Sequence, residues 1–130
     1  MPQRLAIIVP FMLPKPMVLE EYVTERGDSP FGAWFDSLHP VAAAKASVAL
    51  SRIERGAVSN VKGVGEGVLE FRIDVGPGYR IDFGLDGAAL VILLTGGTKR
   101  RQAQDIETAK AHWRSYRSRK RAASKIKGRS

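Results

Sequence analysis

The alternation of apolar and polar residues over positions 69–85 constrains the fold more than any other feature of the sequence. From 69 to 75 apolar residues take every second position, with charged residues between them. Alternation of this kind is typical of a β-strand with one buried face. The tripeptide Gly-Pro-Gly at 76–78 predicts a tight reversal, after which the alternation resumes. The segment therefore predicts an antiparallel β-hairpin with one apolar face and one charged face.

The charged face of this hairpin carries two arginines, Arg72 and Arg80. One interpretation is that they form cross-strand ion pairs on a solvated face, each worth roughly a few tenths of a kcal/mol. The alternative is that they belong to a concave patch that binds phosphate, with Lys62 and Lys99 nearby, since the arginine fork matches two phosphate oxygens. Both interpretations stay open. If Gly-Pro-Gly is a three-residue loop, the facing pairs are Val75 and Tyr79, Asp74 and Arg80, and Arg72 and Asp82.

Outside the hairpin the chain alternates between strand and helix patterns. Ser29 followed by Pro30 marks a helix start, and Pro40 opens a second helix. The apolar run before the glycines at 96–97 suits a central strand, which those glycines would end. The expected fold is α+β: an antiparallel twisted sheet packed against an N-terminal helical hairpin, with a C-terminal helix. The other expected elements are strands at 18–24, 57–62 and 88–95, and a last helix from Thr98 or Lys99 to about Arg121.

The chain divides into three segments by composition. Residues 1–17 are expected to be a non-core N-terminal extension, or to arise from an upstream start codon, because the regular pattern begins only after them. Their apolar stretch is interrupted by Pro10 and is too short to span a bilayer, so no membrane contact is expected. Residues 18–121 form the expected domain, and residues 122–130 an expected basic, disordered tail.

Cysteine content and charge restrict the possible functions. The chain has no cysteine, and His39 and His112 lie far apart, so we expect no disulfide, no metal and no cofactor. A reducing, cytoplasmic location is the expectation that follows. The net charge is +8, and residues 99–130 carry 12 lysines and arginines against two acids. This asymmetry indicates a polyanion or an acidic protein as partner.

Two further stretches are candidate anion sites. The sequence TGGTKRRQAQD at 95–105 places glycines between a strand and a helix, where backbone N–H groups are free to bind an anion. Its spacing is not that of a P-loop, and a plain connection is the alternative. The last helix carries a basic row, which is either a solvated face or a contact to nucleic acid. The residues of this row are Lys110, Arg114, Arg117 and Arg121.

Two motifs give the chain a resemblance to a known family. The motifs are VKGVGEGVLEFRIDVGPGYR at 61–80 and LLTGGTKRRQAQDIETAK at 93–110. Together they resemble the RelE/ParE superfamily of toxins from type II toxin–antitoxin modules, and more closely the group known as addiction module killer proteins (HigB/RelE-like). The similarity extends over about residues 31–110. The superfamily fold has the same order of sheet and helices.

For ribosome-dependent members, the resemblance implies mRNA cleavage in the ribosomal A site, without a metal. A ribose 2′-OH attacks the adjacent phosphate, and by position Arg80, Arg72 and Lys99 match basic residues that bind and polarise it. The sequence departs from the family at Glu70, where RelE has a basic residue, and near Ile106, where RelE has a catalytic aromatic residue. Glu70, Tyr79 and Asp105 are then candidates for the general acid and base. The expected RNA-binding residues are Lys62, Arg100, Arg101, Lys110, Arg114 and Arg117.

Three functions stay open at this point. The leading hypothesis is a toxin that acts as a ribosome-dependent mRNA endonuclease and inhibits translation. Its expected partners are the ribosome, mRNA and a separately encoded antitoxin, of the helix-turn-helix type. The alternatives are a ParE-like inhibitor that binds DNA gyrase, and a non-catalytic accessory module that binds nucleic acid.

Overall fold

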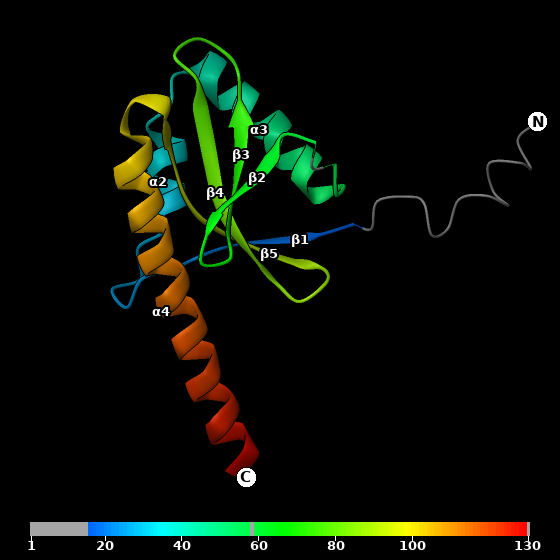
Figure 1. The fold of residues 1–130 in the computed structure, drawn as a ribbon, viewed down its shortest axis with the longest axis vertical. Coiled ribbons are helices and arrows are strands. Elements are labelled where there is room, and N and C mark those ends of the chain that lie inside the picture. The colour runs from blue at the N-terminus through cyan, green and yellow to red at the C-terminus, as the bar shows by residue number, and fades with distance from the viewer. Residues whose placement is uncertain (1–15, 58, 130) are drawn as a thin grey trace, which may run out of the picture.

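A five-stranded sheet with helices on both faces organises the molecule. The computed structural model describes residues 16–57 and 59–129, so most of the expected extension, 1–17, lies outside the described residues. Figure 1 shows the sheet, with strand order β1-β5-β4-β3-β2. The elements are β1 (Val18–Glu21), α2 (Pro30–Asp36), α3 (Pro40–Glu54), β2 (Val61–Gly65), β3 (Val68–Ile73), β4 (Tyr79–Asp86), β5 (Leu90–Thr98), a 3-10 turn (Lys99–Arg101) and α4 (Gln102–Arg129).

The α+β class is confirmed, but the sheet is mixed and not wholly antiparallel. Strands β2 to β5 form antiparallel pairs, whereas β1 runs parallel to β5, with Val18 opposite Leu90. The prediction of an antiparallel sheet was therefore wrong for β1. The reason is that β1 reaches its neighbour through a long connection containing two helices, and such crossovers allow parallel pairing.

The two N-terminal helices start where Ser29-Pro30 and Pro40 predict. The hydroxyl of Ser29 accepts a hydrogen bond from the Gly32 amide at 2.9 Å, and Pro30 takes the first helical position. In α3 the imidazole of His39 accepts from the Ala42 amide at 3.4 Å, again before a proline, Pro40. Both helices therefore begin at positions that the sequence fixes locally.

Each face of the sheet buries its own apolar cluster. Helices α2 and α3 cover one face, where side chains such as Phe71, Ile81 and Phe83 are almost fully buried. Helix α4 covers the opposite face, where Trp113 packs with Val68. Because helices cover both faces of the sheet, part of the charged row on the hairpin is buried against a helix.

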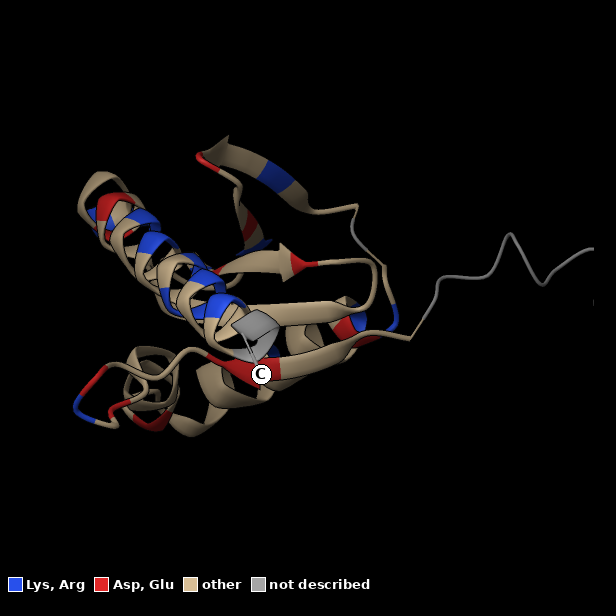
Figure 2. Cartoon of the chain, turned by 90° about the horizontal axis from the view of Figure 1, so that it is seen from below, with Lys and Arg blue, Asp and Glu red and all other residues tan. Residues whose placement is uncertain are grey.

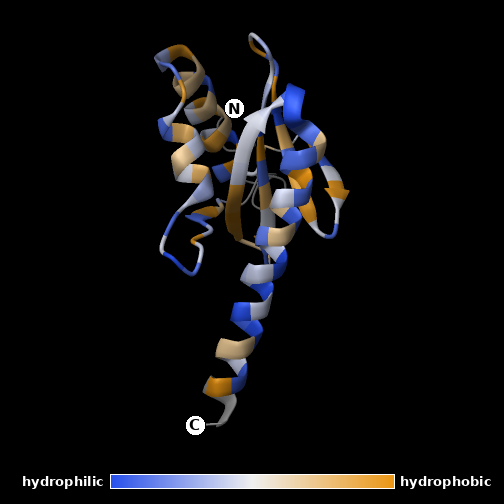
Figure 3. Cartoon of the chain, turned by 90° about the vertical axis from the view of Figure 1, so that its left-hand side faces the viewer, coloured by the Kyte–Doolittle hydropathy of each residue, from blue (hydrophilic) through white to orange (hydrophobic). Residues whose placement is uncertain are grey.

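The last helix is longer than the sequence predicts. Helix α4 continues to Arg129, so the expected disordered tail, residues 122–130, is helical as far as Arg129. The segment contains strong helix formers, Ala122 and Ala123, and no glycine before Gly128, which explains the continuation. Its C-terminal turns extend beyond the sheet (Figure 1). Figure 3 shows hydrophilic residues along most of this helix.

Strand β5 also passes its expected end. Gly96 and Gly97 are paired with β4 and do not terminate the strand. A Cβ atom at Gly96 would lie 2.2 Å from the Trp34 ring, so glycine is needed there for close packing of α2. Among the helices of the described part of the chain, none is long and apolar enough to cross a membrane.

Candidate functional site

The hairpin that carries the candidate arginines is built with a longer loop than Gly-Pro-Gly. Arg72 lies opposite Arg80, and Glu70 lies opposite Asp82, so the predicted pairing of Arg72 with Asp82 was wrong. The loop spans 74–78, because Gly76 and Gly78 both adopt positive φ angles (56° and 80°) within a wider turn. The observed register of the two strands differs from the predicted register by two residues. Every side chain therefore stays on its predicted face.

The part of the charged face that carries Glu70, Arg80 and Asp82 is buried beneath the start of α4, whereas Arg72 stays exposed. The relative exposure of Glu70 and Asp82 is 0%, and that of Arg80 is 2%. The first turn of α4 closes over them with Gln102 and Asp105. The solvated row of cross-strand ion pairs is thus replaced by a buried charge cluster.

Arg80 lies at the centre of this cluster. One terminal nitrogen, Nη2, donates to Asp105 Oδ2 and to the Thr98 carbonyl oxygen, each at 2.7 Å. The other, Nη1, donates to Asp82 Oδ2 at 3.3 Å and lies 3.8 Å from Glu70 Oε2. Three carboxylates therefore surround one guanidinium.

Close packing of strand and helix makes these contacts possible. A Cβ atom at Gly97 would lie 2.1 Å from Asp105 Oδ2, so only glycine allows this carboxylate to reach Arg80. The two glycines of the TGGTKRRQAQD stretch thus admit a side chain on each face of β5, Trp34 on one and Asp105 on the other.

The excess of buried carboxylates changes the charge state of one of them. Burial raises the pKa of Asp82 to about 7; attraction to Arg80 opposes this, and repulsion from Glu70 and Asp105 adds to it. Asp82 is therefore partly protonated near neutral pH. Its Oδ1 atom and the Nε atom of Arg80 are buried without a hydrogen-bond partner among the residues that the structure describes.

A small cavity opens beside the cluster. Its volume is about 90 Å³, several times what a cavity needs to hold one water molecule. Three cations and two carboxylates line it, which gives the wall a net charge of +1. The lining residues are Glu70, Arg72, Asp74, Tyr79, Arg80, Lys99 and Gln102.

The three residues predicted to act on a phosphate therefore line one cavity, but in unequal positions. Arg72 and Lys99 are exposed, and Arg72 Nε lies 3.7 Å from Glu70 Oε1. Arg80 is part of the buried wall. Lys62, on β2, does not line this cavity, although its Nζ atom lies 3.9 Å from Glu70 Oε1. The cavity is thus a candidate anion site with two accessible cations.

One residue of this site was missed by the sequence reasoning. Gln102 donates from Nε2 to both oxygens of Glu70, at 3.2 and 3.3 Å. It precedes Asp105 by three residues, so both side chains lie on the same face of α4. That spacing, within the motif already singled out, was the available signal.

The other predicted RNA-binding residues do not line the cavity. Arg100 and Arg101 are exposed in the 3-10 turn, Lys110 forms an ion pair with Glu107 at 3.4 Å, and Arg114 pairs with Glu66. Figure 2 shows lysines and arginines at many positions along α4. Within the described residues, no group of three or more histidine, cysteine or acidic side chains could hold a metal ion.

The fold and the site define an α+β protein with a buried arginine–carboxylate cluster beside a cationic cavity. The chain matches no protein-family model. It is 40% identical over 81 residues to an uncharacterized protein of Haemophilus influenzae. The aligned residues make up 62% of this chain and 82% of that protein. The chain belongs to the same family as this Haemophilus influenzae protein.

Proposed function

We propose that this protein is the toxin of a type II toxin–antitoxin module of the RelE/ParE superfamily, and that it cleaves mRNA on the ribosome. The observation that carries the proposal is the cavity between β3, β4 and α4, where Arg72, Lys99 and Arg80 converge. Its size and its net positive charge suit a single phosphate group. The family-like motifs at 61–80 and 93–110 supply all of its lining residues.

In the proposed reaction the substrate carries its own nucleophile. The ribose 2′-oxygen attacks the adjacent phosphorus, a P–O2′ bond forms, and the P–O5′ bond breaks. A base takes the proton of the 2′-OH, and an acid gives a proton to the leaving 5′-oxygen. The products are a 2′,3′-cyclic phosphate and a free 5′-hydroxyl, so no other reactant is needed.

The cavity provides groups for each role. Arg72 and Lys99 are exposed and contact the phosphate, stabilising the charge that develops on its oxygens. Glu70, one of the two lining carboxylates, serves as base, and the Tyr79 hydroxyl serves as acid. Arg80 is held by Asp105 and acts from the wall. In this proposal the main role of Arg80 is to position the other groups of the site, and it contributes less to binding the phosphate.

One observation favours a second candidate, the ParE-like inhibitor of DNA gyrase. Three carboxylates surround Arg80, and Glu70 stands where RelE has a basic residue. Negative charge near the phosphate lowers its affinity and opposes cleavage. A toxin that binds its target without cutting RNA is consistent with such a site.

The test is induction of the protein in a bacterial host, with translation rate and mRNA integrity measured. We expect the wild type to stop translation and to leave cleaved mRNA. The Arg72→Ala/Lys99→Ala double variant should reduce cleavage by about 10²- to 10³-fold, since it removes two exposed cations. Arg26→Ala, an exposed cation in the loop before α2, is the matched control and should cleave normally.

The possible outcomes separate the candidates. Arrest with intact mRNA and induced DNA damage would replace the endonuclease by the gyrase inhibitor. An active double variant would show that the cavity is not the site. Absence of any arrest would favour the accessory module that binds nucleic acid.

A further inference from the structure

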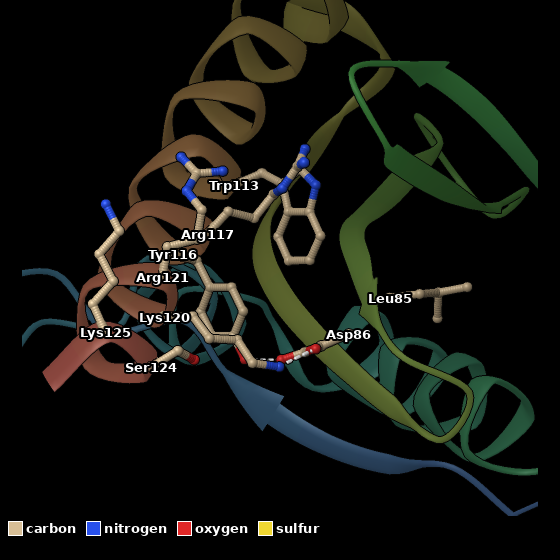
Figure 4. Close-up of a pocket in the computed structure, with 9 residues that line it drawn as sticks. All are labelled: Leu85, Asp86, Trp113, Tyr116, Arg117, Lys120, Arg121, Ser124 and Lys125. Atoms are coloured by element: carbon tan, nitrogen blue, oxygen red, sulfur yellow. Dashed lines mark hydrogen bonds and ion pairs between the residues drawn. The ribbon is translucent and has the colours of Figure 1, made fainter. Parts of the chain in front are cut away.

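An open groove lies on the α4 side of the sheet, away from the cationic cavity. It is formed where α4 passes the end of β4, and its volume is about 500 Å³. Figure 4 shows the side chains around it. Two come from β4 and seven from α4: Leu85, Asp86, Trp113, Tyr116, Arg117, Lys120, Arg121, Ser124 and Lys125.

The floor of this groove is apolar. The rings of Trp113 and Tyr116 stack with centroids 5.4 Å apart and planes 4° apart, and Leu85 is 44% exposed. A Cβ atom at Gly84 would come within 2.6 Å of the Trp113 ring, so the indole also packs tightly against the backbone of β4. Trp113 is therefore buried and offers no open ring face on which a base could stack. An aliphatic side chain, however, can pack beside Leu85.

The wall of the groove is cationic. Arg117, Arg121 and Lys125 follow one another at intervals of four residues and so form one row along α4. None of the three forms an ion pair with another residue in the described part of the chain. The acid in the groove, Asp86, is already engaged: it accepts a hydrogen bond from the Tyr116 hydroxyl at 2.5 Å and pairs with Lys120.

These contacts also define the charge state of the groove. Hydrogen bonds from Lys120 and Tyr116 lower the pKa of Asp86. Asp86 therefore stays ionised and paired with Lys120, while the row of three cations remains available. An apolar floor beside an unpaired cationic row is complementary to a segment with aliphatic residues on one face and acids on the next.

We propose that this groove binds an acidic amphipathic helix of a partner protein. Aliphatic side chains of that helix pack on Leu85 and the edges of Trp113 and Tyr116, and its flanking carboxylates pair with the cationic row. RNA fits less well, because Trp113, the larger ring of the floor, is buried and presents no open face for stacking. A second copy of this chain would bring an equally basic α4 against the row. Identifying the partner as the antitoxin rests on the proposed function. The proposal that the groove binds an acidic amphipathic helix rests only on the chemistry of the groove.

The test measures binding of a synthetic probe to the purified full chain by calorimetry. The probe is a helical peptide of about 15 residues with leucines at every third or fourth position and glutamates between them. Binding is expected, and Leu85→Asp or Arg117→Glu/Arg121→Glu should weaken it at least about tenfold. Val41→Asp, at an exposed aliphatic position on α3, is the matched control and should bind as the wild type does.

Two comparisons keep the proposal open to refutation. A peptide of the same composition with its leucines scrambled should bind at least about tenfold more weakly. Failure of the amphipathic peptide to bind, equal binding by the Leu85→Asp variant, or displacement of the peptide by a short single-stranded RNA would overturn the proposal. Leu85→Ser serves if the aspartate variant does not fold. Because no ribosome is present, loss of the proposed RNA cleavage would leave this result unaffected.

Discussion

Replacing Asp82 by asparagine tests whether burial raises the pKa of this carboxyl group. In the folded protein its pKa is about 7, against an ordinary value of 3.8. Between these values the folded state retains a proton that the unfolded chain has released. The free energy of unfolding therefore falls as pH rises, by about 1.4 kcal/mol per pH unit for one proton. The stabilising contribution is complete below pH 3.8 and is lost above pH 7.

The magnitude follows from the size of the shift. Over the whole window the loss is about 4 kcal/mol, and between pH 5 and pH 8 it is about 3 kcal/mol. Asparagine cannot ionise, yet its side-chain oxygen still accepts from Arg80 Nη1. We therefore expect Asp82→Asn to be more stable than the wild type at pH 8 by up to about 4 kcal/mol, with a smaller advantage at pH 5.

The assay is urea denaturation of both proteins at pH 5 and pH 8, followed by circular dichroism. Titrating groups outside the cluster act in the same way in both proteins; His112, whose pKa burial lowers, is one of them. Asp36→Asn, at an exposed position, controls for exchanging a carboxylate for an amide. Equal pH dependence in wild type and Asp82→Asn, or a less stable Asp82→Asn at pH 8, would refute the reasoning.

Three other substitutions test the packing of the fold. Gly96→Ala should destabilise the protein by about 1–3 kcal/mol, because its methyl group would overlap the Trp34 ring. Arg80→Ala should cost about 3–5 kcal/mol, because it leaves buried carboxylates without their cation. Ser29→Ala should cost about 1 kcal/mol by removing the cap of α2. Thermal or urea unfolding measures all three.

A defined result would contradict each of these predictions. Gly63 has nothing within 4 Å of its Cβ position, so Gly63→Ala should cost much less than Gly96→Ala; equal losses would show that backbone freedom, and not the Trp34 contact, matters. An Arg80→Ala variant as stable as the wild type would show that the cluster is solvated. An unchanged Ser29→Ala would mean that the cap contributes nothing.

The sequence specified the faces of the hairpin better than its register. Side chains alternate strictly along a strand, so Arg72 and Arg80 could be assigned to one face without knowledge of the loop. The loop length depends on the backbone conformations that Gly76 and Gly78 adopt. The residue types alone do not determine these conformations, so they do not determine the register. The convergence of Arg72, Arg80 and Lys99 at one cavity was therefore predictable, whereas the pairing of Arg72 was not.

The burial of Arg80 was beyond the sequence pattern, because it depends on what covers the sheet. The last helix was expected to carry a basic row. In its N-terminal turn, only Gln102 and Asp105 indicate that the helix packs on charged residues. The parallel position of β1 was hidden for a similar reason, since nothing local relates Val18 to Leu90. The function inferred from the family resemblance stays a prediction.

The pairing of β1 with β5 sets the order in which this protein can assemble. The first strand of the described chain finds its hydrogen-bonding neighbour only in the last one, after both N-terminal helices and three other strands have been made. Such distant contacts slow folding, because a long loop must close before they form. During synthesis the edge of β1 stays unpaired until β5 emerges. The cavity also requires Gln102 in the first turn of α4, which follows β5, so a growing chain acquires its site only after β5 and that turn have been made.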